Sequence, residues 1–139
     1  GCDFVLADRT AKFGALEMRG GFPAAVNTAI LGNLLGPRQS LELLLSADMF
    51  DADHLHLVGL INQIFDTADE LEAGAQKFVA NLAALDPIAV QMTKETQRAT
   101  TGMPIADALV MSKHLNALLM SSGRINEAAK FFEQNKKRK

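Results

Sequence analysis

The sequence has little of what builds a disulfide-stapled, membrane-embedded or nucleic-acid-binding protein. Its 139 residues include one cysteine, Cys2, which excludes an internal disulfide framework and a zinc site made of cysteines alone. No apolar run approaches the roughly 20 residues that cross a bilayer. Fourteen lysines and arginines against sixteen aspartates and glutamates give a net charge of −2, so no overall basic field favours nucleic acid or a membrane surface. No signal peptide is present, which predicts a cytoplasmic protein.

The residues that are present predict a folded α/β protein that is mostly helical. Hydrophobic residues make up 48% of the chain, too many for a disordered protein. Strands are expected over residues 4–7, 12–14 and 60–65, and helices over 27–35, 41–48, 52–58, 67–82, 87–99, 105–119 and 125–132. We divide the chain into residues 1–66, which hold the strands, and residues 67–139, which are helical.

Several helix starts are indicated by residue types that cap helices. Asn27 and Asp51 are expected to be N-caps. Thr67 and Glu70 have the spacing of a capping box, and Asp86-Pro87 places an N-cap residue before a proline at the first helical position. The helices that follow carry wider apolar faces than one small bundle buries, which predicts contact with a partner subunit.

Glu17 is the first candidate for chemistry. It lies between a predicted strand and a loop, and Leu16 and Met18 flank it. A carboxyl group held among apolar neighbours has a raised pKa and can exchange protons near neutral pH. The alternative is a solvated loop glutamate, which position alone favours.

Small residues follow Glu17 and precede the first predicted helix. Gly20, Gly21 and the stretch Pro23-Ala24-Ala25 would let the phosphate or carbonyl of a ligand approach backbone N–H groups at the start of that helix. No phosphate-loop lysine and no G-x-G-x-x-G spacing is present, so a nucleotide motif is excluded. The alternative is a tight turn of small residues.

Residues that bind metals do not converge in the sequence. His54 and His56 are two apart in a predicted helix and point to different sides, so they cannot share a metal there. Asp51 and Asp53 lie in an acidic stretch without the glycine and closing glutamate of a calcium loop. Cys2, beside a predicted buried strand, is interpreted as a small hydrophobe rather than a nucleophile. We therefore expect no metal site.

Six stretches stand out in order along the chain: Cys2–Ala7 with Ala11–Gly14, Ala15–Pro23, Leu41–Asp48, Asp51-Ala52 with Gly59–Asn62, Asp86–Val90 with Lys94-Glu95, and Glu127–Lys137. Together they resemble the C-terminal half of the enoyl-CoA hydratase/isomerase (crotonase) family. The second stretch is similar to the family's active-site segment, usually a Pro-Glu pair followed by Gly and then Pro. Here Leu16 stands in place of the usual proline, and Ala24-Ala25-Val26 replaces a glycine-rich stretch.

The resemblance implies a fold and an assembly. Residues 1–66 would form the end of the crotonase-like ββα spiral together with its active-site loop, and residues 67–139 would form a helical trimerisation region. A homotrimer or hexamer is then expected. Family members are longer than this chain, and the strand predicted at its very start favours the interpretation that an N-terminal half is missing.

The resemblance also implies chemistry on acyl-CoA thioesters. The reaction would be hydration or double-bond isomerisation of an unsaturated acyl-CoA, through an enolate held by two backbone N–H groups. Glu17 matches the family's catalytic glutamate, whose role is general acid/base. Coenzyme A enters as part of the substrate, and no other cofactor is implied. Substrate contacts are expected from Gly21, Phe22, Pro23, Ala24, Phe132 and Lys136.

The same resemblance limits what this chain is expected to do alone. The missing half would supply both N–H donors, so the 139 residues alone are expected to be weak or inactive catalysts. The alternative is a non-catalytic oligomerisation or interaction fragment. The acyl chain, and the choice between hydratase, isomerase and other reactions of the family, stay open.

Overall fold

The computed structural model describes residues 2–121. By their contacts the residues form two compact units, Gly1–Leu82 and Ala83–Lys139. The division predicted at residue 66 separates the strand-containing part from the helical part and is not based on contacts. It stays a prediction. The predicted helix over 125–132 and the terminal lysines lie outside the described residues.

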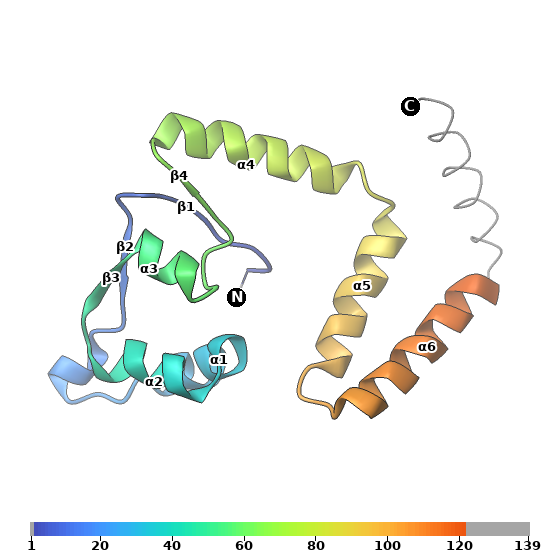
Figure 1. Cartoon of the computed structure of the whole chain (residues 1–139), viewed down its shortest axis with the longest axis horizontal. Coiled ribbons are helices and arrows are strands. Elements are labelled where there is room, and N and C mark those ends of the chain that lie inside the picture. The colour runs from blue at the N-terminus through green and yellow to red at the C-terminus, as the bar shows by residue number, and fades with distance from the viewer. Residues whose placement is uncertain (1, 122–139) are drawn as a thin grey trace. The chain divides into compact units, whose positions relative to one another are not determined.

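The first unit combines short strands with helices (Figure 1). Its elements are β1 (Leu6–Asp8), β2 (Lys12–Gly14), a 3-10 helix η1 (Glu17–Gly20), α1 (Ala25–Leu35), α2 (Pro37–Leu45), β3 (Met49–Asp51), α3 (Ala52–Leu57), β4 (Gln63–Phe65) and α4 (Ala68–Ala83). The described part of the chain is therefore α/β and mostly helical, as the sequence predicts.

Two separate strand pairs organise this unit. β1 and β4 run parallel, with Ala7 opposite Ile64. A parallel pair needs a crossover connection, and here the crossover contains every element from β2 to α3. β2 and β3 run antiparallel, with Phe13 opposite Phe50. The strand β3 was not predicted, because three residues carry too little periodicity to indicate a strand without their partner.

The core of the first unit lies where β1, α2 and α3 meet. The buried cluster consists of Ala7, Leu43, Ala52, Leu55 and Ile61. It is small because the strands are only three residues long, so each one contributes little apolar surface. The α4 helix is joined to this unit by ring contact, since Phe78 lies edge-on to Phe4 with 5.0 Å between ring centroids.

Two of the predicted helix starts form the capping hydrogen bonds expected of them, and a third forms one of its two. The N–H of His54 donates to the Asp51 carboxylate at 2.8 Å, and the N–H of Ala89 donates to that of Asp86 at 2.9 Å. The predicted capping box is half formed. The N–H of Glu70 donates to the Thr67 hydroxyl at 3.2 Å, but the Glu70 carboxylate accepts from the N–H of Asp66 instead of that of Thr67.

The prediction of Asn27 as an N-cap is wrong. The helix α1 begins two residues earlier, at Ala25, and its N-cap Ala24 makes no side-chain capping bond. Ala24 is 6% exposed, and its carbonyl accepts the N–H of Thr28 at 2.8 Å. Packing of Ala24 thus takes the place of a capping side chain, which leaves Asn27 inside the first turn.

The second unit is described over a helical hairpin, α5 (Pro87–Thr100) and α6 (Ile105–Ser121). The two helices contact each other, and Gly102 adopts φ +80° in the turn between them. Neither helix has a buried residue, and Leu109 and Leu118 of α6 are 63% and 66% exposed. Within residues 2–121, no helix is both long enough and apolar enough to cross a membrane.

Candidate active site

Glu17 is the first residue of η1, and only Ala15 and Leu16 separate it from the β2 strand. The 3-10 turn is closed on itself, because the N–H of Phe22 donates to the Glu17 carbonyl at 3.1 Å. It ends at Gly21, whose φ of +77° is one that residues with a Cβ rarely adopt. The Glu17 side chain, like those of Leu16 and Met18, is exposed, so among the described residues it is the solvated loop glutamate that its position favours.

The Glu17 carboxylate is held by a side chain that is ten residues further along the chain. The Asn27 amide nitrogen donates to Glu17 Oε1 at 2.9 Å. Asn27 is the third residue of α1, and helical side chains tilt toward the N-terminus of their helix. That direction brings the amide back over the loop that leads into α1. The sequence analysis missed this contact because it interpreted Asn27 as an N-cap. An asparagine near a helix start can cap the helix, or it can bind a glutamate in the preceding loop.

A second contact fixes the other side of the Glu17 turn. Arg19 forms an ion pair with Asp48 at 2.7 Å, which ties η1 to the residue before β3. The β2–β3 pair adjoins Asp48 and leaves no room for a side chain at Gly14. A Cβ at Gly14 would lie 2.8 Å from the Asp48 carbonyl oxygen and 2.6 Å from Met49 Sδ. Glycine therefore permits the approach that places the turn.

An apolar cavity of about 150 Å³ lies within the first unit. Of the residues that line it, Asn27 alone has a polar side chain. The wall comes from β2, α1, α2, β3 and α3, and consists of Phe13, Gly14, Ala15, Asn27, Leu31, Leu43, Phe50, Leu55 and Leu60. Asn27 thus lines the cavity and also binds the candidate carboxylate through its side-chain amide.

The other predicted substrate residues lie at different depths. Phe22 is 71% exposed, Gly21 and Pro23 are exposed, and Ala24 is buried. The N–H groups of Gly21 and Phe22 donate to carbonyls within the η1 turn. Their role in binding substrate stays a prediction. Phe132 and Lys136 lie outside the residues that the structure describes.

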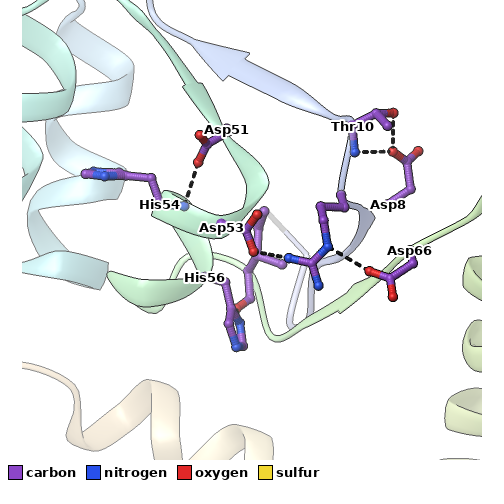
Figure 2. Close-up of polar contacts among 9 residues, drawn as sticks. Asp8, Thr10, Asp51, Asp53, His54, His56 and Asp66 are labelled. Atoms are coloured by element: carbon purple, nitrogen blue, oxygen red, sulfur yellow. Dashed lines mark hydrogen bonds and ion pairs between the residues drawn. The ribbon is translucent and has the colours of Figure 1, made fainter.

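A separate polar cluster surrounds the ends of β1 and β4 (Figure 2). Arg9 bonds both Asp53 and Asp66, the latter at 2.7 Å, and these bonds raise the pKa of the Arg9 guanidinium further above its usual range. The hydroxyl and N–H of Thr10 both donate to the Asp8 carboxylate and lower its pKa. The cluster joins β1 to α3 and to the residue after β4, which is a structural task.

The cluster does not converge on a metal. His54 and His56 point apart in Figure 2, as their spacing predicts. His54 lies against the Phe50 ring, and His56 Nδ1 is 2.8 Å from the Ile61 carbonyl oxygen. Among the residues described, no group of three or more histidine, cysteine or acidic side chains could hold a metal ion. Cys2 lies before β1 and is exposed, and its interpretation as a small hydrophobe rather than a nucleophile stays a prediction.

The fold is that of the crotonase-type proteins. An enoyl-CoA hydratase subunit from Geobacillus kaustophilus matches 96% of this chain with a TM-score of 0.84 and 25% identity, and 52% of that chain is covered. A putative enoyl-CoA hydratase from Streptomyces coelicolor matches the same share with a TM-score of 0.85 and 25% identity, covering 49% of that chain.

The chain belongs to the enoyl-CoA hydratase/isomerase family, whose model matches residues 1–139. A putative enoyl-CoA hydratase from Thermus thermophilus is 31% identical over 134 residues, which are 96% of this chain and 53% of that protein. A crotonyl-CoA hydratase from Syntrophomonas wolfei is 33% identical over 94 residues, 67% of this chain and 36% of that protein. The chain spans about half the length of the first of these relatives, which is consistent with the expected half of a family fold.

Proposed function

We propose that this chain carries the acid/base part of an active site that hydrates or isomerises an unsaturated acyl-CoA thioester. The observation that carries the proposal is the placement of Glu17. In a chain of this family, its exposed carboxylate is bonded to Asn27, which is also a wall residue of the apolar cavity. An exposed carboxylate can reach a bound substrate, and an apolar cavity beside it suits an acyl group.

The proposed chemistry needs a proton carrier at the α-carbon of the thioester. In hydration, the oxygen of water bonds to Cβ while the π electrons of the double bond pass into the enolate. Glu17 is the group proposed to deliver a proton to Cα, and the proton that the attacking water loses restores it. In isomerisation, Glu17 would accept a proton from one carbon and return it to another. Both routes pass through an enolate, whose oxygen needs preorganised N–H donors. The family resemblance assigns these donors to the part of the fold that this chain does not span.

The test is hydration of crotonyl-CoA by the full-length gene product, followed by loss of the enoyl thioester absorbance. Glu17→Gln removes the proton carrier and keeps the side chain's shape, so kcat/KM should fall by about 10²- to 10⁴-fold. Glu42→Gln makes the same charge change at an exposed position of α2 and should leave kcat/KM unchanged. Turnover that survives Glu17→Gln contradicts the proposed role.

The product separates the two reactions. Hydration gives a β-hydroxyacyl-CoA with one added water, and isomerisation gives an enoyl-CoA of unchanged mass with the double bond moved. Mass analysis of the thioester formed from a 2-enoyl and from a 3-enoyl substrate distinguishes them. A 2-enoyl substrate that gains the mass of water supports hydratase activity.

A second candidate function is oligomerisation, proposed as a homotrimer or hexamer. It is favoured by α5 and α6, which bury no residue within the second unit and expose Leu109 and Leu118. Apolar faces of this kind are typical of helices that pack against another subunit. Native mass measurement tests the assembly, and coenzyme A titration of the same sample tests substrate binding. An assembly that binds no coenzyme A would favour the non-catalytic interpretation.

A further inference from the structure

We propose that Asn27 is a positioning residue for Glu17, and that its side-chain amide sets the direction of the carboxylate toward the cavity. The proposal rests on the proposed function of Glu17 and extends it to a residue outside the six stretches that resemble the family. Asn27 does not touch the reacting atoms in this scheme. It acts through Glu17.

The donor and acceptor of the Asn27–Glu17 hydrogen bond are fixed by the two side chains. A carboxylate only accepts hydrogen bonds, so the nitrogen of the Asn27 amide must face it. The 2.9 Å distance from Nδ2 to Glu17 Oε1 is that of a well-formed bond. Within residues 2–121, this is the one side-chain hydrogen bond that the Glu17 carboxylate accepts. Without Asn27, an exposed glutamate would be free to adopt several rotamers.

Asn27 is itself held more firmly than the group it binds. It is half-buried, it belongs to an eleven-residue helix, and it forms part of the cavity wall. Glu17 belongs to a single 3-10 turn. Asn27 therefore determines where the Glu17 carboxylate points. Because Asn27 is also a wall residue of the cavity, it sets that direction relative to the cavity.

Loss of this bond should change turnover more than binding. In this scheme Asn27 acts on the reacting carbon only through Glu17, so its loss should lower kcat by a larger factor than it changes KM. The carboxylate would spend less time aligned with the reacting carbon, and misplacement of a catalytic group by about 1 Å costs up to roughly 10²-fold. For Asn27→Leu we expect kcat to fall by about 10-fold or more.

The kinetic experiment uses the full-length gene product and variants at position 27. Asn27→Leu removes both polar atoms, keeps the branching of the side chain at Cγ and improves helix propensity, so α1 is retained. Asn27→Gln keeps the amide donor on a longer stem and should recover part of the lost kcat. Asn33→Leu, at an exposed position of the same helix, is the matched control and should keep the original kcat. Glu17→Gln is measured beside them.

A spectroscopic experiment reports the bond without activity. The side-chain amide signals of Asn27 and Asn33 are assigned by NMR in the 139-residue chain and in its Glu17→Gln variant. Replacing the charged acceptor should shift the Asn27 signals and leave those of Asn33 in place. The Glu42→Gln variant should shift neither set.

The outcomes separate this proposal from the function on which it rests. A fall in kcat for Asn27→Leu, with partial recovery in Asn27→Gln and a shift of the Asn27 amide signals, supports it. Wild-type kcat in Asn27→Leu together with lost turnover in Glu17→Gln overturns the positioning role and leaves the proposed function intact. Turnover that is absent throughout, or unaffected by Glu17→Gln, overturns both. Unshifted Asn27 signals overturn the bond.

Discussion

At the end of β1, Asp8 closes the turn toward β2 through bonds that depend on its charge. Its carboxylate accepts the Thr10 hydroxyl and the Thr10 N–H, and these bonds lower the pKa of Asp8 below its model-compound value of 3.8. A carboxyl with a lower pKa in the folded state than in the unfolded state stabilises the fold when ionised. The contribution is complete above the unfolded pKa and is lost as pH falls through the folded one.

We expect Thr10→Val to weaken the acid dependence of stability. Val keeps the shape of threonine and removes the hydroxyl donor, the largest cause of the lowered pKa. Between pH 5 and the acid limit of folding, the melting temperature of the original chain should fall more than that of Thr10→Val. Circular dichroism melts at several pH values measure this, with Asp8→Asn as the control that cannot titrate. Parallel curves for the original chain and Thr10→Val would contradict the assignment.

Gly14 has no Cβ, and both the β2–β3 pairing and the position of the candidate site depend on that absence. A Cβ there would meet the Asp48 carbonyl oxygen at 2.8 Å, and backbone cannot move aside as a side-chain tip can. We expect Gly14→Ala to push β2 from β3, to displace the η1 turn and to lower stability by about 1–3 kcal/mol. Urea unfolding measures the stability, and unchanged unfolding would show that the strands tolerate a wider spacing.

At the scale of elements, the α-helices α1 and α4 each contain a glycine, and the same change should have opposite effects in them. Gly32 of α1 has open space around the position of a Cβ. Gly74 of α4 faces Phe65, the last residue of β4, and a Cβ there would lie 2.2 Å from two ring atoms. Glycine thus weakens α1 without a packing reason, whereas in α4 it makes room for the ring.

We expect Gly32→Ala to stabilise the chain by about 0.5–1 kcal/mol, because alanine is the better helix former and nothing obstructs it. Gly74→Ala should destabilise it by about 1–3 kcal/mol, because the Phe65 ring must leave its position. Urea unfolding of the two variants beside the original chain measures both signs. A stabilising Gly74→Ala would mean that α4 does not pack on Phe65 in solution.

The accuracy of the sequence-based predictions depends on how local each signal is. Asp51 and Asp86 were predicted as caps because the bond each forms lies within three residues. Asn27 was assigned wrongly because its partner, Glu17, is ten residues away and outside its helix. The strand β3 was missed for the same reason, since it exists through its pairing with β2. Glu17 itself was found through a resemblance to a family, not through periodicity.

At the scale of the whole molecule, the expected activity depends on how much of the family fold this chain spans. The chain covers 53% of the Thermus thermophilus relative. The family resemblance assigns the glutamate to this chain and both N–H donors to the remainder. Removal of a single oxyanion donor in other enzymes costs about 10²–10³ in kcat. Absence of both N–H donors should lower kcat by more than the removal of one donor does, whatever the state of the Glu17 carboxylate.

We therefore expect the 139-residue chain alone to show no measurable hydration of crotonyl-CoA. A chimera in which this chain replaces the matching 53% of the Thermus thermophilus relative should regain turnover, because the remainder of that protein would restore the donors. The chimera with Glu17→Gln is the control, and it should be inactive although it folds and assembles in the same way. Turnover by the isolated chain that Glu17→Gln abolishes would contradict this prediction, and would require the N–H donors to come from the 139 residues themselves.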